Sequence, residues 1–378
     1  MLYLTSYLNR ITFLHITTNT SSLKFTKERI NDFDARYFVN EIATASKYLG
    51  ILEAKIDSYQ FNSILIPMLQ KKEAISSMYI EGTQTTIPDV LKSEINPKPG
   101  NKKIQYEVRN HIKTLIFGTE YLRSGKFTHS FLKQLHTYMM TDIIAPELNN
   151  TLGKYKIKDN QIKSSTGATV YTPPSASETK RYMDELITFM NDPEDEIHPL
   201  IKAAIIHSQF ESIHPFSDGN GRIGRILISL YLHKVRVINF PFFYISEAIN
   251  LDKTVYYRLL TYSRTSSLDE WIKYFLHKVC VQAVYHIDYI DMLNALYNKT
   301  KNKVKECINS PKFDEIIECL FTYPVLNAYI LEDQLSVSRG QAVRYLHALE
   351  DKNILLGDDR KRGKQYFFTE LIELAQRT

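Results

Sequence analysis

Apolar residues recur at helical spacing along most of the chain, and this pattern predicts a mainly α fold. The stretch Asp34–Leu69 shows it at Val39, Ile42 and Leu49, and a second helical stretch ends at Gly82, a typical helix stop. Further helices are predicted over Glu107–Leu122, Phe127–Met140, Ser175–Asn191, Pro199–Ile213, Ile223–Val235, Thr254–Tyr262 and Leu268–Asn298.

Two segments interrupt the helical pattern. Between residues 154 and 174, two short strand-like pieces flank Ser164 and Gly167, and this arrangement predicts a β-hairpin that ends at Pro173 and Pro174. Residues 92–103 contain two prolines and a glycine, so they are predicted to form a linker.

The last 65 or so residues follow a different pattern. Short helices are predicted over Phe313–Phe321 and Asn327–Leu335, and Ser338 begins a third, with Gln341 completing a capping box. Ile354–Leu356 and Tyr366–Phe368 flank a glycine-containing turn and predict a hairpin. Three helices and a hairpin indicate a winged helix-turn-helix.

Basic residues on this tail would allow contact with DNA phosphates, although the sequence as a whole does not favour DNA binding. They are Arg339, Arg344, His347, Arg360, Lys361, Arg362 and Lys364. Nearby acidic residues dilute the charge, so a solvated face or a surface for protein contacts stays an alternative.

Composition adds limits to this picture. The 378 residues with 44% hydrophobic content predict two or three packed domains and exclude a disordered or fibrous chain. Three cysteines without a C-x-x-C pair argue against disulfides or a zinc module, and they favour a reducing, cytoplasmic location. No apolar run reaches the roughly 18 residues of a membrane span, and the N-terminus, interrupted by Asn9, Arg10 and His15, is not interpreted as a signal peptide. A net charge of +5 does not by itself favour nucleic acid.

Glycine is scarce, yet three of the 13 glycines fall at Gly219, Gly221 and Gly224. Their spacing matches a dinucleotide fingerprint, but no strand precedes them, so that interpretation is set aside. His207, Glu211 and His214 could share a helix face as metal ligands; no second Glu-x-x-His occurs, however, and Pro215 disfavours helix at His214. His207 and Glu211 are expected simply to satisfy one another.

The same segment fits an anion site with a base beside it. Residues 218–221 can form a nest of backbone N–H groups at a helix start, and Arg222 and Arg225 lie three apart on one face of that helix. Asp218 is a candidate Mg²⁺ ligand, and His214 can accept a proton near neutral pH. Together these residues predict transfer of a phosphate-containing group to a hydroxyl.

The run HPFSDGNGRIGR, residues 214–225, resembles the signature of the Fic (filamentation induced by cAMP) family at every fixed position. Further motifs of the family occur along the chain in the expected order: SSMYIEGTQTT, LHTYMM, YTPP, FPFFYISEAI and VYYRLL. The resemblance therefore covers roughly residues 35–285. It implies a Fic-type helical bundle with a hairpin flap. The predicted domains are an N-terminal helical region (1–105), a Fic domain (106–298) and the winged helix-turn-helix (312–378).

The resemblance implies a protein adenylyltransferase that moves AMP from ATP to a Ser, Thr or Tyr hydroxyl, on a target protein or on itself. His214 would take the proton, and Asp218 would coordinate Mg²⁺. Arg222 and Arg225 would neutralise phosphates, Asn220 would add a side-chain contact, and Gly224 would also serve helix packing. The implied nucleotide-binding set is Gly219, Asn220, Gly221, Arg222, Ile223, Gly224, Arg225, Tyr256 and Tyr257.

Ser77, Glu81 and Gly82 match the inhibitory pattern of the same family. The resemblance implies that Glu81 pairs with Arg225 and misplaces the γ-phosphate; the alternative is that Ser77 and Glu81 are ordinary helix residues. The implied partner is a target protein docked on the flap, with a homodimer and DNA left open and no membrane. Two further functions stay open: a nucleotide-sensing transcription regulator, and removal of AMP at the same site.

Overall fold

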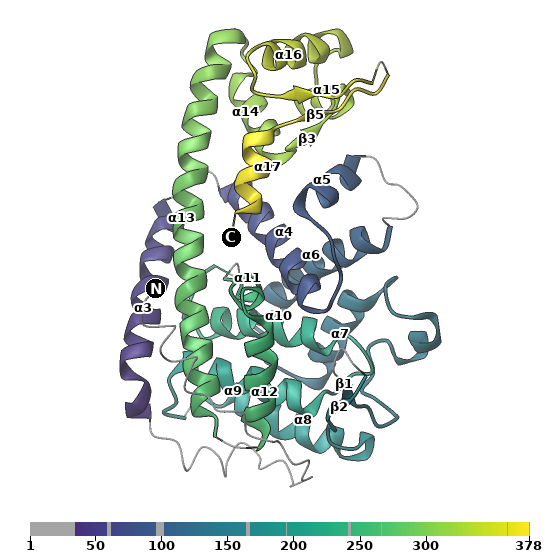
Figure 1. Ribbon diagram of the computed structural model, residues 1–378, viewed down its shortest axis with the longest axis vertical. Coiled ribbons are helices and arrows are strands. Elements are labelled where there is room, and N and C mark those ends of the chain that lie inside the picture. Colours follow the sequence, from purple (N-terminus) through teal and green to yellow (C-terminus); the bar gives the residue numbers. More distant parts are fainter. Residues whose placement is uncertain are drawn as a thin grey trace.

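The computed structural model describes residues 35–58, 62–95, 102–163, 167–193, 195–240, 243–265, 267–360 and 362–377. Within them the chain is mainly helical, as predicted (Figure 1). The first part contains η1 (Ala35–Phe38), α3 (Val39–Ser58), α4 (Asn62–Ile80), α5 (Ile87–Ile95), α6 (Lys102–Leu122), α7 (His129–Met140), η3 (Pro146–Thr151), α8 (Ala176–Asn191), α9 (Pro199–Ile213) and α10 (Asn220–Lys234). The second part contains α11 (Ser246–Asn250), α12 (Lys253–Thr265), α13 (Asp269–Cys307), α14 (Phe313–Thr322), α15 (Ala328–Leu335), α16 (Arg339–Asp351) and α17 (Thr369–Gln376).

Helix α9 is the centre of the fold. Every residue from Leu200 to Ile213 is buried, which is typical of a helix surrounded by others rather than one with a polar face. Helices α10, α8, α12 and α13 pack against it. The bounds of α9 agree with the predicted helix, and its last residue directly precedes His214.

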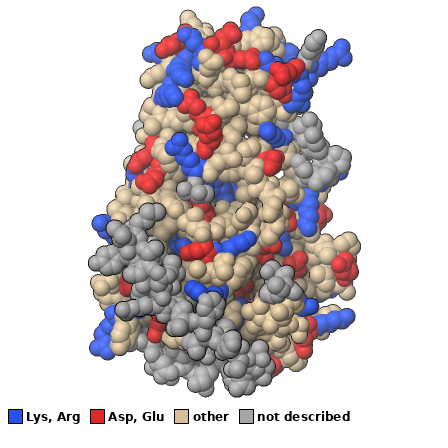
Figure 2. Space-filling view, in the orientation of Figure 1, with Lys and Arg blue, Asp and Glu red and all other residues tan. Residues whose placement is uncertain are grey.

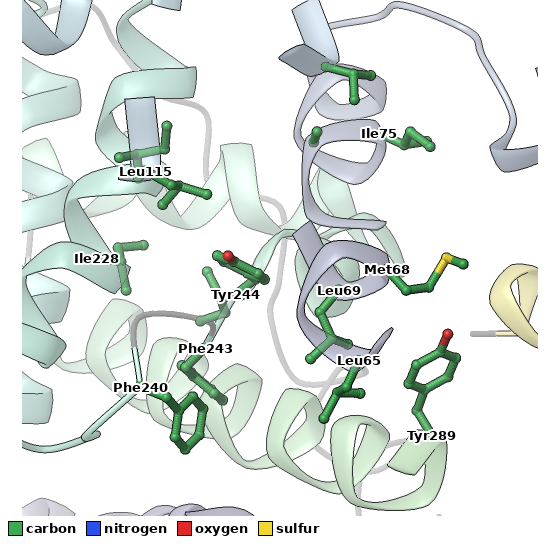
Figure 3. Packing of buried hydrophobic residues seen from close by; sticks show 14 of the residues in the cluster. Leu65, Met68, Leu69, Ile75, Leu115, Ile228, Phe240, Phe243, Tyr244 and Tyr289 are labelled. Atoms are coloured by element: carbon green, nitrogen blue, oxygen red, sulfur yellow. The ribbon is translucent and has the colours of Figure 1, made fainter. Parts of the chain in front are cut away.

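Helix α4 is packed from two sides. It presents Leu65 and Leu69 toward Phe243 and Tyr244, while Met68 lies on the side of Tyr289 in α13 (Figure 3). Near its C-terminal half, the buried Glu73 carboxylate accepts hydrogen bonds from the backbone N–H and the hydroxyl of Ser246, at the first residue of α11. Burial of apolar surface and a satisfied buried carboxylate therefore both fix the position of α4.

Several predicted boundaries were wrong. Both ends of the predicted linker 92–103 are helical, because α5 extends to Ile95 and α6 begins at Lys102 rather than Glu107. The pattern over Asp34–Leu69 belongs to two helices, α3 and α4, rather than to one. The helix predicted to end at Asn298 is α13, which continues to Cys307 because Thr300 and Val304 extend its buried face. Helix α13 runs along the molecule from α9 and α12 to the C-terminal helices (Figure 1).

Both predicted hairpins are present. Strands β1 (Ile162–Lys163) and β2 (Thr169–Tyr171) pair antiparallel, with Ile162 opposite Tyr171. In the tail, β4 (Leu356–Gly357) and β5 (Tyr366–Phe367) pair, and β3 (Val325–Leu326) adds to the other side of β5. The third strand was missed because two residues carry no alternation to detect. Helices α5, α11 and α17 were missed as well.

The tail helices begin at capped residues. The Asn327 side chain accepts from the backbone N–H groups of Tyr329 and Ile330, and Ser338 accepts from that of Gln341. The Gln341 side chain donates to Tyr345 instead of returning to the cap, so the capping box is half formed. The winged helix-turn-helix assignment and the domain boundaries stay predictions.

Other expectations fall on segments that the structure does not describe. The N-terminal residues 1–34, residues 96–101 of the predicted linker, Ser164 at the hairpin turn and Lys361 lie outside the described residues. Among the described residues, no helix is both long and apolar enough to cross a membrane.

Candidate active site

His214 caps the C-terminus of α9 in an unusual backbone conformation. Its φ of 49° lies in the left-handed region, and its N–H donates to the Phe210 carbonyl at 2.9 Å. The ring is mostly buried, with Nδ1 4.0 Å from Oε2 of Glu211. Burial, together with the cationic Arg264 and Lys156, lowers the pKa of His214 to about 4. The ring is therefore neutral at physiological pH. Its pKa is lower than the near-neutral value that the sequence suggested.

The loop after His214 is closed by Asn220. Its Oδ1 accepts from the Phe216 backbone N–H and its Nδ2 donates to the Phe216 carbonyl, both at 2.8 Å. The residue is 2% exposed, and in this structure its side chain shapes the loop from within; its contact with a ligand stays a prediction. Gly219 has a φ of 79°, and a Cβ there would lie 2.6 Å from Sδ of Met140, so both conformation and space require glycine.

We expect Asn220→Ala to destabilise the protein by about 1–3 kcal/mol, because it leaves the buried Phe216 N–H without its partner. Denaturant titration measures this change in the free energy of unfolding. The exposed Asn150 in η3 offers a matched control, Asn150→Ala, with a change within about 0.5 kcal/mol. Equal stability of the two variants would contradict the role of Asn220.

His136 in α7 supports this loop from outside, and the sequence analysis did not single it out. Its ring stacks on Phe216 at a centroid distance of 4.1 Å. Nδ1 accepts from the Gly153 N–H, which leaves Nε2 as the donor to the Asp218 carbonyl at 3.0 Å. Burial lowers the pKa of His136 to about 4, so the ring keeps this neutral form. Its only sequence signal was the family motif LHTYMM.

Asp218 is the exposed carboxylate of the site. Its side chain is 44% exposed, Oδ1 accepts from the Gly219 N–H at 2.6 Å, and Nη2 of Arg222 lies 3.5 Å away. Among the described residues, no group of three His, Cys, Asp or Glu side chains could hold a metal. This includes the set His207, Glu211 and His214 that was considered from the sequence. Mg²⁺ is usually bound by one or two carboxylates together with substrate phosphates. Asp218 thus fits an ion that arrives with a phosphorylated ligand.

The two arginines differ in their surroundings. Arg222 lies between Asp218 and Glu107 of α6, with Nη1 3.6 Å from the Glu107 carboxylate, a neighbour that the sequence analysis missed. Arg225 is 1% exposed. Its Nε donates to Oγ of Ser77, and its Nη2 donates to the Ser77 carbonyl at 3.0 Å and to Oε1 of Glu81 at 2.8 Å. The structure therefore brings Ser77, Glu81 and Arg225 together.

Glu81 reaches Arg225 because of how α4 ends. The helix stops at Ile80, and Gly82 adopts a φ of 93°, with its N–H bonded to the Tyr79 carbonyl and the next N–H bonded to that of Met78. This is a Schellman termination, which favours glycine at the left-handed position. It directs the Glu81 side chain over α10.

The Glu81 carboxylate occupies the start of α10. A Cβ on Gly221 would collide with it, so the carboxylate lies directly over this glycine. Burial raises the pKa of Glu81, but the cationic Arg225 and Arg222 outweigh that effect and lower it, so Glu81 is ionised. An anion therefore already sits where the nest and the two arginines were predicted to hold phosphate.

Tyr256 and Tyr257 lie in different surroundings. Tyr256 is 1% exposed, and its hydroxyl bonds to Nε2 of His207 at 2.9 Å. His207 thus pairs with Tyr256, whereas the sequence analysis expected it to pair with Glu211. Tyr257 is half exposed, and its hydroxyl donates to the Ile80 carbonyl at 2.9 Å, so it contacts the end of α4.

Ile223 and Gly224 face away from the loop surface. Ile223 is fully buried in the core. A Cβ on Gly224 would collide with the Glu211 carboxylate, so this glycine allows close packing of α10 on α9, as expected. In this structure Ile223, Gly224 and Tyr256 belong to the core. Gly221, Arg222 and Arg225 lie around the Glu81 carboxylate, and Gly219 is the N-cap of α10.

Fold and site together define a helical protein in which a neutral histidine precedes a loop and a helix start where the Glu81 carboxylate contacts Arg225. Residues 126–232 match the Fic/DOC family and residues 39–120 the Fic/DOC family N-terminal region. The chain therefore carries a Fic/DOC family domain preceded by the N-terminal region of that family.

Known proteins resemble the chain at modest identity. It is 25% identical over 182 residues to the probable protein adenylyltransferase aq_aa38 of Aquifex aeolicus, covering 46% of this chain and 51% of that protein. It is 26% identical over 180 residues to the protein adenylyltransferase and cysteine protease IbpA of Histophilus somni, covering 46% of this chain and 4% of that protein. The matched segment thus spans about half or less of these relatives.

A solved structure shows the same fold. A Fic family protein from Desulfovibrio desulfuricans G20 aligns with a TM-score of 0.57 at 18% identity, covering 89% of this chain and 97% of that one. At this identity the likeness shows the fold alone.

Proposed function

We propose that the protein is an adenylyltransferase that moves AMP from ATP to a Ser, Thr or Tyr hydroxyl of a target protein, and of itself. The observation that carries the proposal is the neutral His214 directly before a closed loop that leads to Gly221, Arg222 and Arg225. The Fic/DOC domain and the adenylyltransferase names of the relatives support the choice of AMP.

The reaction follows from this arrangement. The acceptor hydroxyl gives its proton to His214 while its oxygen bonds to the α-phosphorus, and the bond to pyrophosphate breaks. A base with a pKa of about 4 accepts the proton only as the new bond forms, which suits a loose phosphoryl-type transition state. Backbone N–H groups at the start of α10, with Arg222 and Arg225, stabilise the phosphate oxygens. Asp218 would hold Mg²⁺, which supplies further charge neutralisation when bound.

The same proposal includes autoinhibition by Glu81. Its carboxylate holds Arg225 through a 2.8 Å hydrogen bond and covers Gly221. ATP phosphates would have to replace an ionised carboxylate on a buried guanidinium. Displacing Glu81 would free the cation for the nucleotide. The target would dock on the β1–β2 hairpin, in a cytoplasmic setting.

Incubation with ATP and Mg²⁺, followed by mass spectrometry, tests the proposal. We expect a mass gain of one AMP on the protein, or on a protein of an added cell lysate. Label in the α-phosphate of ATP should be retained and label in the γ-phosphate lost. Retention of the γ-label would identify phosphate transfer instead, and no gain on any protein, with the Glu81→Gly variant included, would contradict the proposal.

The alternative of a DNA-binding regulator finds less support in the tail. Arg339 pairs with Glu332, Arg360 with Asp358, and Lys364 with Glu350. Arg344 and His347 are exposed on α16. Figure 2 shows basic and acidic side chains intermixed over this end of the molecule. Phosphate contacts would have to compete with these ion pairs.

A further inference from the structure

Four consecutive backbone carbonyls around His214 are held by two residues from one distant segment. Lys156 binds the carbonyls of Ile213 through Nζ (3.1 Å) and of Pro215 through its backbone N–H (2.8 Å). Nδ2 of Asn160 donates to the carbonyls of His214 (3.1 Å) and Phe216 (3.2 Å). Every carbonyl from residue 213 to 216 thus has a partner in the segment 156–160.

Lys156 and Asn160 act as one unit. Nζ of Lys156 also donates to Oδ1 of Asn160 at 2.8 Å, which orients the amide toward the loop. Lys156 is only 3% exposed, and burying an ammonium group is costly unless its hydrogen bonds are satisfied. An apolar side chain would fill this buried position at lower cost. The lysine is therefore explained by its hydrogen bonds to the backbone next to His214.

The segment continues directly into the hairpin. Strand β1 begins two residues after Asn160. At the other end of the hairpin, Tyr171 lies under the guanidinium of Arg264, 4.3 Å from the ring centroid. Arg264 donates through Nη2 to the Glu211 carbonyl and through Nε to Ser212, both at 3.3 Å. Both ends of the hairpin are therefore connected to the end of α9.

We propose that Lys156 and Asn160 are positioning residues that hold His214 in its left-handed conformation and tie it to the β1–β2 hairpin. A left-handed conformation is unfavourable for a residue other than glycine and persists only where its surroundings fix it. The inference rests on the proposed function for its kinetic consequence. If the carbonyls are released, the ring shifts, and a displacement of about 1 Å can cost up to roughly a hundredfold in rate.

Asn160→Ala and Lys156→Met test the proposal, both made in the Glu81→Gly variant. For Asn160→Ala we expect kcat of self-modification to fall roughly tenfold to a hundredfold. KM for ATP should stay unchanged, because Gly221 and Arg225 are untouched. Lys158→Met is the matched control, since Lys158 is exposed in the same segment and binds none of the four carbonyls. It should keep the kcat of its parent.

A second readout does not depend on activity. The charged groups that face His214 are Glu211 on α9, Arg264 on α12, Lys156, and Glu81 after α4. Removing the cation in Lys156→Met should raise the pKa of His214, measured by NMR titration of the ring. Lys158→Met should leave that pKa in place.

The outcomes separate the two proposals. An inactive Glu81→Gly variant contradicts the adenylyltransferase, and the NMR titration then decides the positioning role. Unchanged kcat in Asn160→Ala, a rise in KM for ATP as large as the fall in kcat, or an unchanged pKa of His214 in Lys156→Met overturns the positioning role. If Lys156→Met does not fold, Asn160→Asp replaces it, since it keeps the acceptor for Lys156 and removes both donations; a retained kcat would again overturn the inference.

Discussion

The Glu81→Gly variant is expected to transfer AMP roughly ten- to a hundredfold faster than the wild type. Glu81 occupies Arg225 and the position above Gly221, so its removal frees the guanidinium for phosphate. A hydrogen bond to a charged group contributes roughly 1.5–3 kcal/mol, which converts to about this range of rates. The lower end is expected because the Glu81 side chain is 33% exposed.

Self-modification with labelled ATP measures this effect. Glu147→Gly serves as the control, because it removes an exposed glutamate from η3, away from Arg225. It should leave the rate at the wild-type value. Equal rates for the wild type and Glu81→Gly would show that Glu81 does not inhibit.

The His214→Ala change, made in the Glu81→Gly background, is expected to lower the rate by about 10²–10⁴, the usual contribution of a general base. ATP binding should be retained because the nest and the arginines are unchanged. The pH dependence has a defined sign. Burial favours the neutral ring, so the base form persists as the pH falls and is lost only as the pH approaches about 4.

Single-turnover assays with saturating ATP between pH 4 and pH 8 measure both effects. His347→Ala removes an exposed histidine from α16 and should change neither the rate nor its pH profile. A His214→Ala variant with the parental rate would assign the proton transfer to another group.

Predictions from the sequence were most accurate where the structure depends on residues that are close together in the chain. The loop 214–221 and the start of α10 follow from neighbouring residues whose spacing sets their geometry. The contact of Glu81 with Arg225 came from the family resemblance, and the structure confirms the contact. The helical fold and both hairpins followed from hydrophobic period and turn residues.

Long-range support was not visible in the sequence. His136, Lys156 and Asn160 lie far from residue 214 in the chain, and a single histidine, lysine or asparagine carries no periodic signal. Tyr256 and Tyr257 were assigned one role, yet consecutive residues on a helix point about 100° apart, so one enters the core and one reaches α4. Sequence alone does not say which.

Helix α13 joins the C-terminal helices to the centre of the fold. With 39 residues and a rise of about 1.5 Å per residue, it is roughly 58 Å long. It packs against α3 and α9 at one end and against α14 and α17 at the other, without a proline along its length. The C-terminal helices and the helix that ends at His214 therefore pack against one continuous helix, which fixes the spacing between them.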